Sequence, residues 1–388
     1  MFPVISRTLS VRSRLLQRAG FAILCLAASC KPAEPSLQYY TTPSTYETVK
    51  VKMPPAGNEV RNVILMIGDG MGLEQVSCAW VLNKGKLNLD LFPSVGLSRT
   101  YCTDRLITDS GAGGTALAAG VKTAESHVGT AADSTDLASF LVKAQQLGKK
   151  TGVAVTCHLA DATPCDFCCH NEYRYNQEDL IADYLDCGVD YISGGGLDWF
   201  TVNRTDGRNI AKEMAGKGYT VALTEEELLK AGLPVIGILA PDNLPVAQER
   251  GDLYRHTVRR GLDILSAESG EKGFVMMLEG SSIDDWLHGN DIGKAMEELL
   301  DFDRTIGDVL EWAAADGHTL VVVTADHATG CLTLQDGDLE KGEIGVFFAS
   351  ESHNGIAVPV YAWGPGSDAF TGIRENDEWG RILASYIQ

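Results

Sequence analysis

The chain has 388 residues, 45% of them apolar, and a formal net charge of −20. This length and composition suffice to bury a full core as one large α/β unit, so disorder is excluded as the default state. Nucleic acids and anionic membranes bind clustered lysine and arginine, so the acidic balance argues against both as electrostatic partners. An anionic ligand would need local cations, such as bound metal ions, to reverse the repulsive field.

Residues 1–30 differ in composition from the rest of the chain. Four arginines precede an apolar run from Ala19 to Ser29, and Cys30 follows. This layout is typical of a signal peptide, and the run is too short for a permanent membrane helix. The stretch Leu26–Cys30 resembles a lipobox, whose cysteine is acylated, although Ala27 stands where that pattern prefers leucine. We therefore expect export to the periplasm or cell surface, with Cys30 as a lipid anchor or, alternatively, ordinary cleavage nearby.

Residues 31–59 and 60–388 are predicted to behave differently. The first segment contains five prolines between Lys31 and Asn58 and few apolar pairs, which predicts a tether. In the second, continuous apolar runs of strand length alternate with stretches of helical periodicity. Predicted strands are 63–67, 152–156, 274–278, 320–324 and 358–362, and predicted helices include 135–147 and 294–315. The alternation indicates an α/β fold, a three-layer sandwich with a central, mostly parallel sheet.

Reactive side chains stand where several of these strands end. Asp69 follows the first strand, Thr163 lies beyond the second, Glu279 follows the third, and Asp326 with His327 follows the fourth. Open α/β sheets bind ligands outside the carboxyl ends of their strands. We therefore expect these residues to converge on one crevice, although a single polar residue after a strand is routine loop chemistry.

Ser110 enters a run of small residues, Gly111 to Ala116. A helix beginning here could pack close to the crevice and present amide groups to a phosphate oxygen. Serine is a weak nucleophile without a base or a metal, and with no GxSxG motif around it, metal coordination is the more natural activator. The alternative is a purely structural role, in which Asp109 or Ser110 caps the N-terminus of the helix and stabilises it by about 1 kcal/mol. Both roles are compatible.

Excluding Cys25 and Cys30, eight cysteines remain: 78, 102, 157, 165, 168, 169, 187 and 331. In an exported protein, cysteines pair as disulfides more readily than in the cytosol. The Cys165-x-x-Cys168-Cys169 cluster resembles half of a metal knuckle, but no second CxxC accompanies it. We expect disulfides or buried thiols rather than zinc ligands.

Two later segments carry further candidate metal ligands. Asp284 and His288 are four residues apart, so a helix would place them on one face, where both could bind one metal. When no other ligand accompanies it, such a pair more often lies on a solvent-exposed helix face than in a metal site. Asp326 and His327 offer oxygen and nitrogen donors suited to zinc, or else a turn aspartate and a surface histidine. His353 lies in the same part of the chain.

Six ordered motifs together resemble the alkaline phosphatase family over residues 60 to 388. They are GDGMG at 68–72, TDSGAGGTALAAGVKT at 108–123, DATP at 161–164, EGSSIDDWLH at 279–288, TADHATG at 324–330 and the His353-Asn-Gly segment. The resemblance implies a metal-dependent phosphomonoesterase with two Zn²⁺ and one Mg²⁺, acting on small phosphate monoesters. It leaves open whether the protein is a monomer or a homodimer.

The resemblance also implies a role for each matching position. Asp69 would bridge one zinc and the magnesium, and Ser110, the nucleophile, would bind that zinc together with Asp326 and His327. Asp284, His288 and His353 would hold the other zinc. Glu279 and Thr163 would bind magnesium, with Asp161 nearby, and Arg174 would clamp two phosphate oxygens.

Two positions depart from common family patterns. Asp161 suits magnesium, whereas relatives with histidine there can take zinc at the third site. Asp285 stands where relatives often carry lysine, histidine or tryptophan near the phosphate. The segment from His327 to His353 is also short, leaving little room for the insertion that caps many members.

Three alternative functions compete with the monoesterase. The phosphodiesterase and nucleotide pyrophosphatase branch of the superfamily usually uses threonine as nucleophile and lacks the third cation that Glu279, Thr163 and Asp161 imply. Phosphomutases of the same fold are normally intracellular, which disagrees with the predicted export. A silent metal-binding or phosphate-binding lipoprotein would need one ligand set to be broken, and none is.

Overall fold

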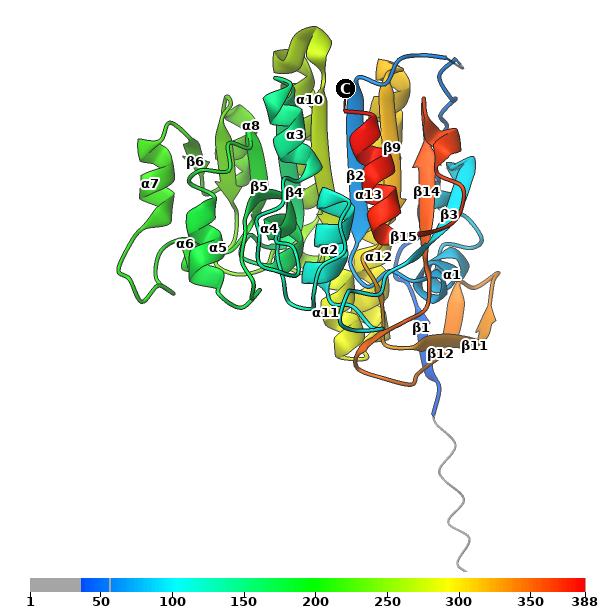
Figure 1. Cartoon of the computed structure of the whole chain (residues 1–388). Helices are drawn as coiled ribbons and strands as arrows, with labels where there is room; N and C mark the ends of the chain where they lie inside the picture. The colour runs from blue at the N-terminus through cyan, green and yellow to red at the C-terminus, as the bar shows by residue number, and fades with distance from the viewer. Residues whose placement is uncertain (1–35, 56, 388) are drawn as a thin grey trace, which may run out of the picture. The chain divides into compact units, whose positions relative to one another are not determined.

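A ten-stranded sheet forms the centre of the computed structural model, which describes residues 36–55 and 57–387 (Figure 1). Nine strands run parallel to one another, and β14 alone is antiparallel to both of its neighbours. The strand order is β15 (Gly372–Glu375), β3 (Ser94–Arg99), β14 (Val358–Trp363), β9 (Thr319–Thr324), β2 (Asn62–Gly68), β8 (Phe274–Gly280), β4 (Lys150–His158), β5 (Tyr191–Gly195), β7 (Val235–Ile238) and β6 (Thr220–Ala222).

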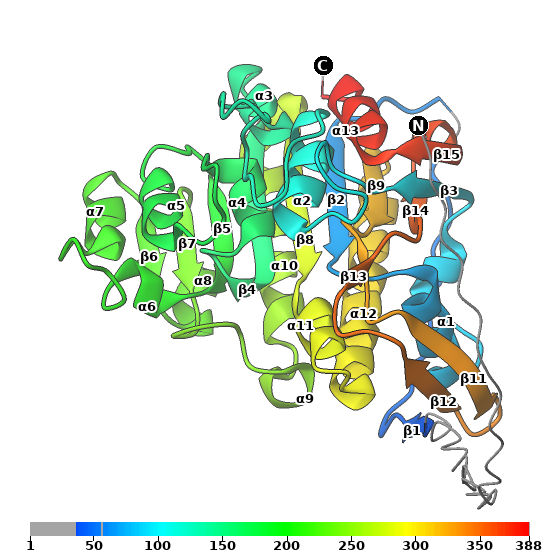
Figure 2. The same ribbon diagram turned by 60° about the horizontal axis from the view of Figure 1, so that its bottom comes forward.

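Helices cover both faces of this sheet, giving the three-layer sandwich that the sequence predicts (Figures 1 and 2). Alternate residues of β2 face opposite layers: Ile64 and Met66 join one core cluster, and Val63 and Leu65 join the other. The first layer contains α1 (Leu73–Leu82), α10 (Leu253–Ser269) and α12 (Ile292–Asp316), and the second contains α2 (Ser110–Ala119), α3 (Phe140–Gln146), α4 (Ala162–Cys168), α5 (Gln177–Asp183) and α13 (Asn376–Ser385).

Shorter helices connect these elements. They are α6 (Leu197–Phe200), α7 (Ile210–Gly216), α8 (Glu225–Lys230), α9 (Ala247–Arg250) and α11 (Ser282–His288). All five predicted strands are present, and α12 spans the predicted helix 294–315. The predicted helix 135–147 is shorter than expected, because α3 begins only after Ser139, whose hydroxyl accepts a hydrogen bond from the Val142 amide.

The predicted tether of residues 31–59 is wrong over its described part. β1 (Gln38–Thr41) pairs with β12 (Glu343–Phe348), which pairs in turn with β11 (Leu332–Asp338). Tyr46 donates a 2.6 Å hydrogen bond from its hydroxyl to Asp303 of α12, and Val49 packs against the core. The prolines in this segment do not prevent packing, because its aromatic and β-branched side chains find apolar partners on the domain.

The predicted signal peptide, Cys30 and residues 31–35 lie outside the described part of the chain. Among the residues that the structure does describe, no helix is both long enough and apolar enough to cross a membrane.

A two-stranded sheet brings distant segments together at one edge of the central sheet. β10 (Ala328–Thr329) pairs with β13 (His353–Asn354), so that Thr329 lies opposite His353. Because β14 is antiparallel, its first residue lies at the edge where the parallel strands end. The segment before β14, which includes His353, therefore lies at the same edge as the residues that follow β2 and β9.

Candidate metal centre

The carboxyl ends of β2, β8 and β9 meet in one crevice, as the sequence predicts. Asp69 directly follows β2, Glu279 is the penultimate residue of β8, and Asp326 with His327 follows β9. These three strands are adjacent in the sheet, with β2 hydrogen-bonded to both of the others. All four side chains are buried, with exposed fractions of 6% or less.

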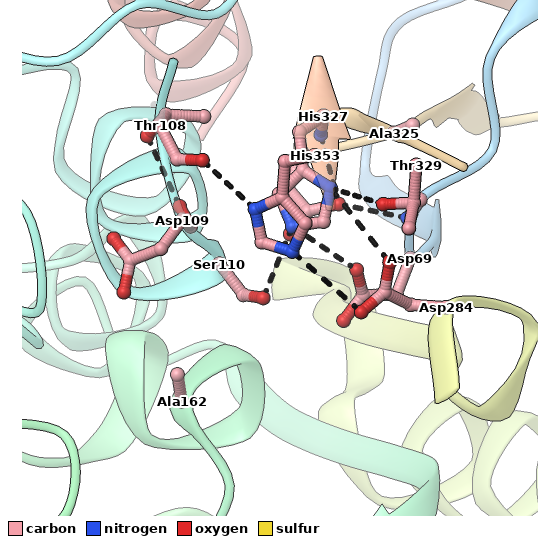
Figure 3. A network of polar contacts seen from close by, with 12 residues as sticks. Asp69, Thr108, Asp109, Ser110, Ala162, Asp284, Ala325, His327, Thr329 and His353 are labelled. Carbon is pink, nitrogen blue, oxygen red and sulfur yellow. Dashed lines mark hydrogen bonds and ion pairs between the residues drawn. The ribbon is translucent and has the colours of Figure 1, made fainter. Parts of the chain in front are cut away.

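One group of ligand atoms surrounds Nε2 of His327. This nitrogen lies 3.1 Å from Asp326 Oδ2. It also lies 3.4 Å from Asp69 Oδ1 and 3.2 Å from Ser110 Oγ (Figure 3). A neutral imidazole nitrogen can form only one hydrogen bond, so it cannot satisfy three oxygens. Burial, together with the nearby His353, holds the pKa of His327 well below its usual value, so the ring is neutral. A cation among these atoms would satisfy all of them.

A second group lies on the other side of His327. His288 Nε2 lies 3.0 Å from Asp284 Oδ2 and 3.1 Å from His353 Nε2. The i, i+4 relation predicted for Asp284 and His288 is realised on α11. Hydrogen bonding to Asp284 raises the pKa of His288 to about 9 when no metal is bound. The His353 ring is fixed from behind by a 2.9 Å contact between its Nδ1 and the Thr108 carbonyl.

A third group lies around Glu279. Burial and the neighbouring Asp161 raise the pKa of Glu279 well above its usual value. Thr163 is in the first turn of α4, and Asp161 is the N-cap of that helix. Although burial opposes its charge, Arg174 and His158 hold the pKa of Asp161 below its usual value. The group therefore offers oxygen ligands, at least one of which is an ionised carboxylate.

Helix α2 places Ser110 at the crevice by close packing. Asp109 is its N-cap and accepts a 3.1 Å hydrogen bond from the Ala112 amide, so the predicted cap is present and Ser110 is the first residue of the helix. A Cβ added to Gly113 would lie 3.0 Å from the Asp326 carbonyl oxygen, and one added to Gly114 would lie 2.1 Å from Asp166 Oδ2. The small residues thus let the helix begin beside Asp326.

Arg174 lies between two carboxylates at the crevice. Its Nη1 contacts Asp109 Oδ2 at 3.2 Å, and its Nη2 contacts Asp161 Oδ1 at 3.0 Å. Burial disfavours the charge, but these two carboxylates outweigh it and raise the pKa of Arg174. Sequence reasoning treated Asp109 only as a cap and missed its role in holding Arg174, because no spacing relates two residues 65 positions apart.

The buried oxygens fit a set of metal ions. Asp69 Oδ1, Thr163 Oγ1, Asp284 Oδ1 and Asp326 Oδ2 make no hydrogen bond within the described part of the chain. Asp69, Asp326 and His327 form one set of ligand atoms within 4.8 Å of one another, and Asp284, His327 and His353 form another. Buried charges without partners cost several kcal/mol each, and bound cations would remove this cost.

Comparison of the sequence with known protein families and relatives identifies the family to which the chain belongs. A family model for alkaline phosphatase matches residues 60–348. The chain belongs to the alkaline phosphatase family. Alkaline phosphatase 4 of Bacillus subtilis is 32% identical over 417 residues, covering 85% of this chain and 89% of the relative. Streptomycin-6-phosphate phosphatase of Streptomyces griseus is 30% identical, covering 84% of this chain and 90% of the relative.

Solved structures of this family share the fold. The alkaline phosphatase of the Antarctic bacterium TAB5 superposes with a TM-score of 0.80 at 33% identity, covering 85% of this chain and 98% of that chain. A His-to-Asp variant of the TAB5 alkaline phosphatase with Mg bound in its M3 site superposes with a TM-score of 0.79 at 33% identity, covering 87% and 99%. The alkaline phosphatase fold therefore accounts for nearly the whole described domain.

Asp285 is one of the two positions at which this alkaline phosphatase family member was expected to depart from common family patterns. Its Oδ2 accepts a 3.1 Å hydrogen bond from Asn243 Nδ2, and Asn243 Oδ1 accepts one from the His158 amide. Although Asp285 is exposed, partial desolvation beside the crevice, together with Asp161 and Asp284, raises its pKa to about 7. Asn243 thus links α11 to the end of β4, a contact that sequence reasoning did not find.

Proposed function

We propose that the chain is an alkaline phosphatase, which hydrolyses phosphate monoesters to an alcohol and inorganic phosphate through a phosphoserine at Ser110. One observation carries this proposal. The Ser110 hydroxyl, at the start of α2, lies 3.2 Å from Nε2 of His327, an imidazole shared by both sets of ligand atoms. The relatives named alkaline phosphatase support the same activity.

We further propose two Zn²⁺ and one Mg²⁺ as cofactors. Mixed carboxylate and imidazole donors suit zinc, and all-oxygen donors suit magnesium. One zinc would take Asp69, Asp326 and His327 with Ser110, and the other would take Asp284, His288 and His353. Glu279 and Thr163 would hold magnesium, with Asp161 nearby and Asp69 bridging to the first zinc. The TAB5 variant with aspartate and bound Mg supports an Asp-containing magnesium site.

Arg174 would bind and orient the substrate. Its planar guanidinium suits two non-bridging phosphoryl oxygens, and Asp109 and Asp161 hold it at a fixed angle. The amide groups at the start of α2 add partial positive charge next to the phosphoryl group. When bound, the metal ions supply positive charge that makes the Ser110 alkoxide accessible and stabilises the entering and leaving oxygens.

The chemistry on Ser110 would proceed in two displacements. In the first, Ser110 Oγ loses its proton and bonds to phosphorus as the bond to the substrate oxygen breaks, and the alcohol leaves after taking up a proton. In the second, a water oxygen loses a proton and bonds to phosphorus, the bond to Ser110 Oγ breaks, Ser110 Oγ takes up a proton, and inorganic phosphate leaves. Arg174 holds the same non-bridging oxygens in both steps, so the phosphoryl group inverts twice without leaving the crevice.

The deciding experiment compares an aryl phosphate monoester with the matching diester, on protein loaded with zinc and magnesium, with and without a chelator. We expect strong, chelator-sensitive preference for the monoester, because a third cation and Arg174 together neutralise its extra charge. Preference for the diester would move the chain to the phosphodiesterase branch. Absence of turnover of either substrate by the fully metallated protein would support a silent binding protein instead.

We also propose export, with Cys30 as the site of a lipid anchor. The arginine-rich start, the short apolar run and the Leu26–Cys30 stretch support this proposal. Labelling cells with a fatty acid tests it, with Cys30→Ala as the control. Label on the parent chain and none on the variant is the expected result, and a released, unlabelled enzyme in both cases would indicate ordinary cleavage.

A further inference from the structure

Thr329 belongs to the TADHATG motif but has no role in the proposed mechanism. It is the last residue of β10, two positions after His327, and both side chains are fully buried. Thr329 Oγ1 lies 3.2 Å from Nδ1 of His327, whereas Ser110 contacts the other ring nitrogen (Figure 3). Among the residues that the structure describes, this Nδ1 has no other hydrogen-bonding partner. What the nitrogen does therefore depends on Thr329.

The two nitrogens of His327 face different groups of ligand atoms. Nε2 lies 3.1–3.4 Å from oxygens of Asp69, Asp326 and Ser110. Nδ1 lies 4.0 Å from Asp284 Oδ1, in the other group. A neutral imidazole has a lone pair on one nitrogen and a hydrogen on the other, so it binds a metal ion through only one of them. The position of the hydrogen therefore decides which group His327 joins.

We propose that Thr329 is a positioning residue that keeps Nε2 of His327 as the metal ligand, in the group that contains Ser110. With a cation on Nε2, the ring hydrogen is on Nδ1 and is donated to Thr329 Oγ1. Nδ1 then has no lone pair to offer a cation held by Asp284. A partner on the second nitrogen also fixes the plane of a metal-bound imidazole and strengthens its binding. This role rests on the proposed zinc ligands and adds which nitrogen of His327 serves which ion.

The surroundings of the His327 ring select one of its two orientations. A half-turn about the Cβ–Cγ bond would put carbon atoms where Nδ1 and Nε2 now lie, so Thr329 and the oxygens around Nε2 would both lose their partner. The ring of His353 stacks on that of His327, with centroids 3.5 Å apart and an interplanar angle of 21°, which limits its tilt. The observed orientation is therefore the one that gives both nitrogens polar partners.

Thr329 can hold the ring because its own backbone is held on several sides. Its amide donates a 3.3 Å hydrogen bond to the Gly70 carbonyl, and its carbonyl accepts a 2.8 Å hydrogen bond from Nε2 of Gln75, in α1. The pairing of β10 with β13 places Thr329 opposite His353. Gln75 is 1% exposed, so this support is buried as well. Thr329 is thus connected to the residue after Asp69 and to a candidate ligand of the second group.

Gly70, in the GDGMG motif, leaves the space that the Thr329 hydroxyl occupies. A Cβ added to Gly70 would lie 3.0 Å from Thr329 Oγ1 and 2.6 Å from Asp284 Oδ1. The φ angle of Gly70 is +68°, which also favours glycine. Two motifs that are far apart in the sequence therefore meet at this hydroxyl.

The first test identifies the metal-bound nitrogen of His327 by NMR of the parent chain, labelled with ¹⁵N-histidine and loaded with magnesium and with ¹¹³Cd in place of zinc. We expect a one-bond coupling between cadmium and Nε2, together with a slowly exchanging hydrogen on Nδ1. The loss of signals in His327→Gln assigns them. Coupling of cadmium to Nδ1 would overturn the role of Thr329 alone. Absence of any coupling to His327 would overturn that role together with the proposed zinc site.

The second test compares Thr329→Val, which keeps the shape of the side chain and removes its hydroxyl, with Thr329→Ser, which keeps the hydroxyl. We expect the valine variant to bind one of its two zinc ions about 10–100-fold more weakly in competition with a chelator, and to lose the slow exchange of the Nδ1 hydrogen. The serine variant should restore both. Equal zinc affinity in Thr329→Val and the parent, or a serine variant as weak as the valine variant, contradicts the role.

Thr305→Val is the matched control for the loss of a buried hydroxyl. Thr305 is also fully buried, and its hydroxyl donates a hydrogen bond to the Asp301 carbonyl within α12. This variant should bind zinc as the parent does. The cadmium experiment uses the parent chain and so decides the assignment even where Thr329→Val does not fold. Neither test measures turnover, so a protein that passes both and hydrolyses no ester would refute the proposed activity and leave the role of Thr329 intact.

Discussion

In the proposed function, Ser110 would gain its reactivity from its neighbours rather than from its own chemistry. Its hydroxyl lies 3.2 Å from His327, and it begins a helix whose N-cap, Asp109, also contacts Arg174. Each of these contacts comes from a different strand end or loop. The residue is 3% exposed, so a phosphoryl group must approach it through the crevice.

Replacing Ser110 by alanine should remove the phosphoenzyme and lower kcat by about 10³-fold or more, because no nucleophile remains on the enzyme. The substitution removes one oxygen, so the fold and the zinc content should persist. Trapping of labelled phosphate after acid quenching, together with metal analysis, measures both. Ala112→Ser, two residues further along α2, is a control that should retain the phosphoenzyme. Substantial multiple turnover by fully metallated Ser110→Ala protein would refute the nucleophile assignment.

At the scale of the element, α2 shows how a helix with poor intrinsic propensity is held in place. It contains three glycines, each of which costs about 1 kcal/mol of helix propensity relative to alanine. Their absent side chains allow contact with the Asp326 backbone, the His127 carbonyl and Asp166. Close packing therefore outweighs propensity in this helix.

Gly114→Ala should lower stability by about 1–3 kcal/mol, because its Cβ would lie 2.1 Å from Asp166 Oδ2 and force a buried carboxyl group to move. Gly216→Ala, at the exposed end of α7, is the matched control, since a Cβ there meets nothing within 4 Å. That change should raise stability by about 0.5–1 kcal/mol. Urea denaturation of both variants measures the difference. Equal effects at the two positions would contradict the packing argument.

The N-terminal strand β1 is the second element whose role is decided by packing. A chain that begins at residue 60 lacks β1 and the Tyr46–Asp303 hydrogen bond, so we expect it to be less stable by about 2–5 kcal/mol. A chain that begins at Leu37 keeps both and should match the longer protein. Thermal unfolding of the two truncated chains tests this, and equal Tm values would restore the tether interpretation.

For the whole molecule, the concentration of buried acids at one edge of the sheet makes folding and metal binding interdependent. Burial and Asp284 raise the pKa of Asp326 to about 6, and burial with Asp326 raises that of Asp69 well above its usual value. A net charge of −20 adds to this repulsion. Without cations the folded chain must hold protons at these carboxyl groups.

Metal removal should therefore change how stability depends on pH. The raised pKa of Asp326 means that the metal-free folded state binds more protons than the unfolded state between about pH 4 and 6, so stability falls as pH rises through that window. His288, with a pKa raised to about 9, extends the fall from about pH 6.5 to 9. The Tm of chelated protein should decrease between pH 4 and 9. Protein loaded with zinc and magnesium should not show this decrease, because its ligands are already deprotonated. A metal-free Tm that rises over this range would contradict the assignment of these raised pKa values.

The sequence by itself determined the strands, the layers and the candidate ligands. Each predicted strand is a continuous apolar run whose alternate residues face two helical layers, a pattern that local hydrophobicity encodes directly. The candidate ligands could be found because they stand at strand ends or at helical spacing, as Asp69 and the Asp284–His288 pair do. The order of the six motifs along the chain then indicated the alkaline phosphatase family.

Tertiary structure decided what depends on contacts between distant segments. The antiparallel direction of β14 brings His353 to the crevice, and no periodicity reveals strand direction. The Asp109–Arg174 pair and the packing of residues 38–51 join positions far apart in the chain. Local patterns report which residues are apolar or reactive, whereas the partner of each side chain is selected only when the sheet order and the helix positions are fixed.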